Sequence, residues 1–149
     1  MAASRREIHL ALRGLLLTAV GLPATRVYEN VVPNPNPPPA GTPYVVEQNV
    51  PATSEVLSAT MQTGAPRMND GLYIAQWFAV DGDGTNNVDD GVDAILAVFP
   101  PGKAITLASG GVLRIKGKPA PYAGGITPLS NGFAFVSVYV PYWVLSSLA

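Results

Sequence analysis

Apolar residues recur at helical spacing in two segments of the chain. Residues 5–20 predict a helix with one apolar stripe, formed by Ile8, Ala11, Leu12, Leu15 and Ala19. The opposite side of this helix is polar and basic, and it carries Arg5, Arg6, His9 and Arg13. Ser4 is suited to cap the helix because Glu7 follows at the capping-box spacing, and Gly21 with Pro23 would end it.

The second helical pattern covers residues 87–99. Its apolar face is formed by Val88, Val92, Ile95, Leu96 and Phe99. Asn87 is the predicted N-cap, and Asp89 and Asp90 would complement the positive end of the helix dipole. The helix is expected to end at the Pro-Pro-Gly sequence of residues 100–102.

The other apolar segments predict β-strands separated by turns rich in Gly and Pro. They cover residues 27–31, 44–50, 54–62, 71–80, 111–116 and 132–145. Residues 71–80 are apolar almost throughout, which predicts burial on both faces. Residues 132–145 alternate, and Pro141 predicts a sheet edge or a strand end because proline lacks an N–H donor. The prolines of residues 33–43 predict an extended connector.

The length of 149 residues predicts one domain, residues 1–149. Because strands mostly follow one another along the chain, the predicted sheet is mostly antiparallel, and both helices would flank it. The expected fold class is therefore α+β.

Charge is distributed in blocks of opposite sign, although the formal net charge is only −1. Residues 68–102 contain no Lys or Arg but six aspartates, Asp70, Asp81, Asp83, Asp89, Asp90 and Asp93. Residues 103–149 contain no acid but four basic residues, Lys103, Arg114, Lys116 and Lys118. If these blocks fold onto different faces, one copy would attract the next through unlike faces, and such a heterologous contact forms a ring or a filament. The alternative is an acidic loop and basic strand ends that are simply solvated.

Composition narrows the functional classes. Charged residues make up 13% of the chain, about half the usual 25%, which fits a surface covered by neighbours or a secreted β domain. The chain has no cysteine, which excludes disulfides, thiolate nucleophiles and Cys-ligated zinc. Its pI is near 5.7 and basic residues do not cluster with aromatic ones, so we expect no nucleic-acid recognition.

Residues 5–20 have a second interpretation as a signal peptide, because two arginines precede an apolar stretch. Glu7, His9 and Arg13 interrupt that pattern, and no convincing cleavage site follows. The segment is also too short, and too interrupted by Arg13, to span a membrane, so we expect no membrane partner.

Residues 81–90 resemble a calcium-binding loop in composition. With Asp81 as position one, positions three, five, seven and nine are Asp83, Thr85, Asn87 and Asp89. Position six is Asn86 instead of Gly, and position twelve is Val92 instead of a bidentate Glu. The mismatch favours an acidic turn over a metal site, and we predict no cofactor. A secreted, calcium-binding, β-rich binding module stays open as an alternative function.

Residues suited to catalysis are scarce. His9 is the only histidine and is predicted to be an exposed helix residue, and the sequence has no serine elbow, P-loop or dinucleotide-binding motif. We therefore expect no enzymatic activity. A small hydrolase or isomerase remains a third hypothesis, because chemistry outside known motifs leaves no signature in a sequence.

The assembled pattern resembles the tail terminator and minor tail proteins of lambda-like long-tailed bacteriophages. The matching segments are residues 6–12, 27–30, 41–45, the strand with Trp77 and Phe78, residues 93–99 and residues 133–142. The resemblance covers nearly the whole chain in element order, and this family has no signature motif. The long proline-rich loop and the concentration of Asp in residues 81–93 depart from the family pattern.

Proteins of that family form a ring, commonly a hexamer, on the head-proximal end of the tail tube. The resemblance implies a sheet flanked by helices, ring contacts between neighbouring sheets, and no catalysis. It also implies three partners: other copies of the chain, the tail tube protein and a head-completion or connector protein. The expected location is the virion tail, after assembly in the cytoplasm of the bacterial host.

The predicted assembly interface pairs basic and acidic residues of neighbouring copies. The basic candidates are either Arg5, Arg6 and Arg13 or Arg114, Lys116 and Lys118. The acidic candidates are Asp81, Asp83, Asp89 and Asp90. Exposed ion pairs contribute about 0–1 kcal/mol each, so they would orient assembly more than drive it. Burial of apolar strand and helix surface would supply the affinity.

Overall fold

The computed structural model describes residues 3–19, 27–29, 43–56, 66–80, 85–129 and 133–147. Within these ranges the chain forms a single α+β domain in which strands dominate. The helices are α1 (Arg5–Leu16) and α2 (Thr85–Val98). The strands are β1 (Val27–Glu29), β2 (Tyr44–Val56), β3 (Pro66–Val80), β4 (Ala104–Thr106), β5 (Val112–Ile115), β6 (Tyr122–Ala123), β7 (Thr127–Pro128) and β8 (Phe133–Ser147). The predicted connector at residues 33–43 lies outside the described residues.

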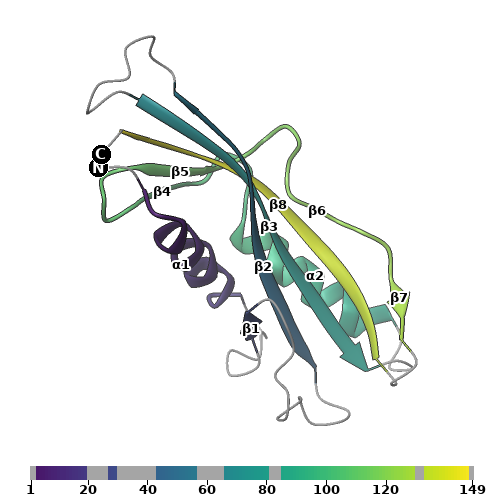
Figure 1. Ribbon diagram of the computed structural model, residues 1–149. Helices are drawn as coiled ribbons and strands as arrows, with labels where there is room; N and C mark the ends of the chain where they lie inside the picture. The colour runs from purple at the N-terminus through teal and green to yellow at the C-terminus, as the bar shows by residue number, and fades with distance from the viewer. Residues whose placement is uncertain are drawn as a thin grey trace.

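All of these strands belong to one sheet, in the order β1-β2-β3-β8-β5-β4, with β6 and β7 also paired to β8. Only β1 and β2 are parallel, and the other described pairings are antiparallel. The long strands β2, β3 and β8 run side by side along the length of the molecule (Figure 1). The predicted α+β class with a mostly antiparallel sheet is thus confirmed.

Helix α1 begins as predicted but ends early. The Ser4 hydroxyl accepts a hydrogen bond from the Glu7 backbone N–H, as an N-cap does. The helix ends at Leu16 rather than at residue 20. Leu16, which lies beyond the predicted stripe, is fully buried with Leu12, so the segment that also resembled a signal peptide is part of the folded core.

Helix α2 carries the predicted apolar face, and Val88, Ile95 and Phe99 are buried in the core. The predicted N-cap was wrong, because the helix begins at Thr85 and Asn87 therefore lies inside it. Several residues before Val88 are suited to capping, so the apolar pattern fixes the face of the helix but not its first turn.

Both helices pack on the same face of the sheet, and the core lies between them and the sheet. The strands contribute alternate residues to this core, among them Tyr73, Ala75 and Trp77 of β3 and Val136, Val138 and Val140 of β8. Helix α2 approaches closely because Gly91 lies over Trp77, where an added Cβ would be 2.4 Å from the indole ring. We call this side of the sheet the helix face and the opposite side the second face.

The second face is only partly buried, and no described helix covers it. Leu72, Ile74 and Gln76 of β3 are half-buried there, so the prediction that this strand is buried on both faces was wrong for most of its length. Phe78 is the exception, because it stacks between Tyr44 and Phe135 at ring-centroid distances of 4.5 and 5.1 Å. The apolar character of β3 therefore reflects a core on one face and a partly exposed aromatic surface on the other.

Residues 54–62 do not form a separate strand. Residues 54–56 continue β2, whose pairing with β3 shifts register between Pro51 and Thr53, and residues 57–62 lie outside the described residues. The irregularity allows the strand to continue past Pro51.

Pro141 marks neither a sheet edge nor a strand end, contrary to prediction. It lies within β8, which is flanked by β3 and β5, and it pairs with Leu72. The Lys116 N–H donates to the Pro141 carbonyl at 2.9 Å, so the missing N–H of Pro141 points to the same side, where β5 has just ended at Ile115. The hydrogen-bonded ladder to β3 therefore loses no donor at this position.

Candidate functional site

The residues predicted to form the assembly interface belong to two groups. Some already form ion pairs within the chain, and the others form none among the described residues. Arg13 contacts Glu47 at 2.6 Å and Lys116 contacts Asp70 at 3.1 Å, so both cations are engaged inside one copy. Within the described parts of the chain no ion pair is formed by Arg5, Arg6, Arg114, Lys118, Asp89 or Asp90, and all six are exposed. Asp81 and Asp83 lie outside the described residues.

The exposed acids of α2 and the exposed arginine of β5 lie on opposite sides of the sheet. Asp89, Asp90 and Asp93 lie on the exposed side of α2, over the helix face. Arg114 alternates with the buried residues Leu113 and Ile115 of β5, so its side chain lies on the second face. The sequence analysis predicted head-to-tail contacts if charges of opposite sign lie on different faces, and Arg114 and the α2 aspartates are arranged in this way.

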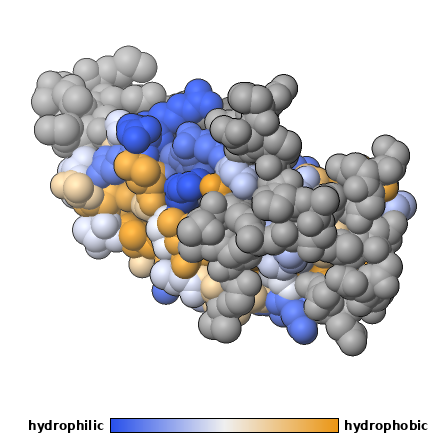
Figure 2. All heavy atoms as spheres, turned by 90° about the horizontal axis from the view of Figure 1, so that it is seen from below, coloured by the Kyte–Doolittle hydropathy of each residue, from blue (hydrophilic) through white to orange (hydrophobic). Residues whose placement is uncertain are grey.

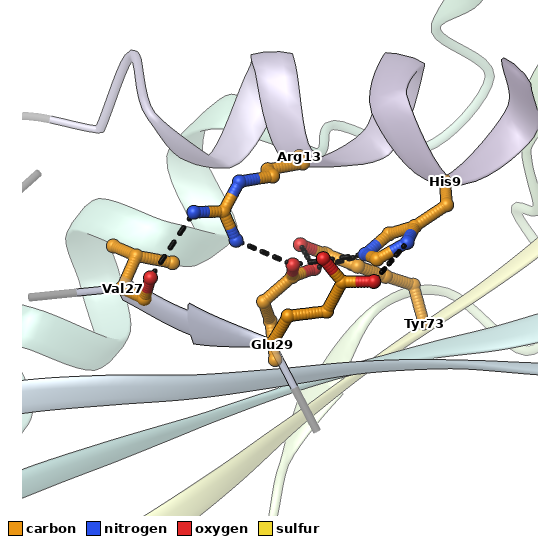
Figure 3. Close-up of polar contacts among 6 residues, drawn as sticks. His9, Arg13, Val27, Glu29 and Tyr73 are labelled. Carbon is orange, nitrogen blue, oxygen red and sulfur yellow. Dashed lines mark hydrogen bonds and ion pairs between the residues drawn. The ribbon is translucent and has the colours of Figure 1, made fainter. Parts of the chain in front are cut away.

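A buried charge cluster joins α1 to the sheet (Figure 3). Its centre is Glu47 of β2, whose side chain is fully buried. One Glu47 oxygen accepts from Arg13 at 2.6 Å, and both oxygens lie within 2.9 Å of His9 Nε2. The Tyr73 hydroxyl donates a short hydrogen bond to the other oxygen. Three groups on two elements thus surround the carboxylate, which is how a buried charge is stabilised.

The same cluster holds the edge strand β1. Arg13 donates to the Val27 carbonyl at 3.1 Å, and His9 Nδ1 lies 3.3 Å from Glu29. Figure 3 shows Arg13 and His9 pointing from α1 toward β1 and the sheet. Both ring nitrogens of His9 therefore face carboxylate oxygens. His9 is not the exposed residue that the sequence predicted, since its side chain is 13% exposed.

The environment of this cluster strongly raises the pKa of one tyrosine, Tyr73. Burial raises the pKa of Tyr73, and the neighbouring Glu47 carboxylate raises it further, because both disfavour a phenolate. Tyr73 therefore stays protonated, and donates to Glu47, above the pH at which a solvent-exposed tyrosine ionises.

His9, Glu29 and Glu47 place ligand atoms within 4.8 Å of one another, a donor set that could hold a cation. Arg13 and Tyr73 already engage the Glu47 oxygens, however, and Arg5 and Arg6 line the adjoining cleft of ≈ 290 Å³. The positive charge of these guanidinium groups makes the cluster unfavourable for a bound metal cation. We interpret the cluster as a clamp between α1, β1 and β2.

Sequence reasoning missed Glu47, although a signal was present. Glu47 alternates with Val45 in an apolar strand, so it belongs to the face that Val45 buries. A lone acid on a buried face requires a cationic partner, and the basic side of the first predicted helix supplies two.

The calcium-loop pattern is not matched by the backbone. Thr85, Asn87 and Asp89 all belong to α2 and not to a loop, and Asp81 and Asp83 lie outside the described residues. Among the described helices, none has the length and apolarity to cross a bilayer.

Other surface features of the second face are aromatic and apolar. Tyr122 stacks on Tyr139 with ring centroids 5.0 Å apart, and the Arg114 guanidinium lies 5.8 Å from the centre of the Trp143 ring. Elsewhere, Leu10 and Leu17 of α1 are exposed by 50% and 38%. Figure 2, seen from below, shows hydrophobic residues lying directly beside strongly hydrophilic ones. Such mixed surfaces are typical of sites where another protein binds.

Comparison with known proteins identifies the fold but no family. No family model matches the sequence, and no curated protein matches it. A solved structure of a protein without a functional name has a TM-score of 0.70 and 19% identity, covering 96% of both chains. That likeness shows the shared fold. A chain from the virion of a native gene transfer agent particle has 18% identity over 95% of this chain and 90% of its own, with a TM-score of 0.45, which is too low to support an argument.

Proposed function

We propose that this chain is a structural protein of a phage-like virion that assembles with copies of itself and does not act on a substrate. The observation that carries the proposal is the separation of charge between α2 and β5. Exposed aspartates lie over the helix face, and the exposed cations Arg114 and Lys118 of the second face form no ion pair within the described residues. A molecule with complementary opposite sides associates head to tail, and such contacts close into rings or extend into filaments.

The absence of enzymatic activity is part of the proposal. The only histidine has both ring nitrogens next to carboxylates, and its partners serve to hold α1 on the sheet. A histidine engaged in this way is poorly placed to accept a proton from a substrate.

The finer role we propose is that of a ring-forming tail terminator or tail-completion component. In this role the ring caps the tail tube and joins it to the head-completion or connector proteins, in the virion tail, after assembly in the cytoplasm of the bacterial host. The support is the order of elements in the sequence, now seen as one helix, a long antiparallel sheet and a second helix on the same face. The half-buried aromatic second face would supply apolar area for contacts between sheets.

Electron microscopy of the purified chain, alone and mixed with a phage tail tube protein, tests both levels of the proposal. We expect closed rings at high protein concentration, and rings at one end of tubes whose length they limit. Rings that never bind tubes would remove the terminator role but leave the assembly role. Particles that stay monomeric under both conditions would contradict the proposal as a whole.

A further inference from the structure

An open cleft on the second face is built from basic residues and one tryptophan. It has a volume of ≈ 490 Å³ and lies between the turn after α2, strand β5 and β8. Its lining residues include Pro101, Gly102, Arg114, Lys116, Lys118 and Trp143.

Two of the three cations of this cleft have partners within the chain. The Arg114 guanidinium lies 5.8 Å from the Trp143 ring centre and donates to the Gly102 carbonyl at 3.4 Å. Lys116 is fixed by Asp70 at 3.1 Å. Three cations face one carboxylate, so the cleft carries excess positive charge, with Arg114 and Lys118 exposed and without an ion pair in the described part of the chain. A fixed arginine loses little side-chain entropy when it binds a carboxylate.

The matching acids lie on the other side of the same molecule. Asp89, Asp90 and Asp93 are exposed on α2, and Asp89 and Asp93 share a stripe because they are four residues apart. Gly91, between them, packs on Trp77, which pairs with Val136, whereas Arg114 pairs with Trp143. Seven residues of strand span roughly 20 Å, about twice the screening length at 0.1 M salt. The acids therefore do not neutralise the cleft within one chain.

We propose that the cleft at Arg114, Lys118 and Trp143 binds the α2 carboxylates Asp89, Asp90 and Asp93 of a second copy of this chain. The inference rests on the proposed function, and it names the contact by which that assembly would form. Because donor and acceptor surfaces lie on opposite faces, each copy has one of each free, and the contact propagates.

A second basic cleft, at Arg5 and Arg6, is the alternative binding site for the α2 carboxylates of another copy. It lies beside α1 on the helix face, the same face that carries α2, and it contains the carboxylate of Glu29. Pairing α2 with this cleft would join two copies through the same face, which gives a two-fold dimer and not a ring. The two clefts therefore predict different symmetries.

Cross-linking tests the contact directly, because the chain has no cysteine of its own. We expect Asp93→Cys on one copy to be joined by a short thiol cross-linker to Lys118→Cys on another copy, in mixtures of the two variants. Arg6→Cys is the control acceptor. A cross-link of Asp93→Cys to Arg6→Cys in place of Lys118→Cys would overturn the proposal in favour of the two-fold dimer.

Neutral variants test whether the contact propagates. Asp89→Asn/Asp90→Asn/Asp93→Asn lacks the acidic surface, and Arg114→Gln/Lys118→Gln lacks the basic one. Each alone should associate at least about tenfold more weakly than the unaltered chain, while their mixture should stop at a one-to-one pair. Arg5→Gln/Arg6→Gln should assemble like the unaltered chain. Circular dichroism checks that each variant is folded.

The outcomes separate this inference from the proposed function. Assembly of the neutral variants at full strength would overturn the inference and leave the assembly role intact. No assembly of the unaltered chain at any concentration, together with no cross-link, would contradict both. If Arg114→Gln/Lys118→Gln lost affinity for a short DNA duplex but assembled normally, the cleft would be a phosphate site and the proposal would be wrong.

Discussion

At the scale of single residues, Glu47 is the side chain on which the position of α1 most depends. It is fully buried, and its partners come from α1 and β3, which are far apart in the sequence. A buried carboxylate with several donors contributes little net energy compared with an apolar core, but removing one member of the cluster leaves the others unpaired.

The substitution Glu47→Gln should therefore destabilise the fold by about 3 kcal/mol, because it leaves Arg13 and His9 without their shared carboxylate. Urea unfolding monitored by tryptophan fluorescence measures the effect. Glu29→Gln is the control, since that side chain is 50% exposed and its loss should cost less than about 1 kcal/mol. Equal effects of the two substitutions would show that Glu47 is not the centre of the clamp.

Tyr142 should make stability fall at high pH. Its hydroxyl donates to Asn49 at 2.6 Å, and burial raises its pKa from 10.0 to about 12. A raised pKa in the folded state contributes stability that is fully present below pH 10 and is lost as pH rises toward 12, since only the unfolded chain releases the proton readily in that window. Tyr142→Phe should reduce the slope of unfolding free energy against pH between 10 and 12. Tyr73, whose pKa is also raised, keeps part of that slope. An unchanged slope in the variant would contradict this assignment.

At the scale of elements, two helical glycines offer a matched pair. An added Cβ at Gly91 would lie 2.4 Å from the Trp77 ring, whereas a Cβ at Gly14 would have no atom within 4 Å. The close approach of α2 to β3 therefore depends on Gly91, while Gly14 has no packing role.

Gly91→Ala should lower stability by about 1–3 kcal/mol, because the helix must move off the sheet. Gly14→Ala should raise it by about 0.5–1 kcal/mol, because alanine is the better helix former. Thermal unfolding followed by circular dichroism distinguishes the two signs. A stabilising effect at both positions would mean that α2 does not lie against Trp77.

The sequence predicted the long elements well, because their apolar residues follow regular periods. Residues 87–99 and 132–145 show their faces directly, and the burial of Val88 and Val138 confirms them. Strands β4, β6 and β7 have two or three residues, too few for any period to appear, and they form only because β5 and β8 lie beside them. Pro141 was misread because a sequence does not show to which neighbour a missing N–H points.

The candidate site was harder to predict than the fold. Arg114 and Lys116 were both expected in the interface, but the sequence did not show that Lys116 pairs with Asp70 within the chain. Arg13 was likewise expected in the interface, but it forms an ion pair with the buried carboxylate of Glu47, which lies 34 residues away in the sequence. Pairings between distant segments depend on sheet order and register, and neither is encoded in a local pattern.

At the scale of the whole molecule, the sheet lies between the exposed acids of α2 and the basic cleft at Arg114 and Lys118, while Arg5 and Arg6 lie on the same face as α2. Its helix face carries the exposed acids of α2, and its second face carries the cleft of Arg114 and Lys118 beside a half-buried aromatic surface. Apolar burial between copies would supply most of the affinity, and the charges would set the orientation. A ring closes if the rotation added by each contact sums to a full turn without a shift along the axis.

Native mass spectrometry of the unaltered chain at low ionic strength, over a range of concentrations, is the most direct test of head-to-tail self-assembly. We predict one dominant closed oligomer of more than two copies, with a mass that is a whole multiple of 15.5 kDa. Monomers and dimers alone, at every concentration, would contradict it.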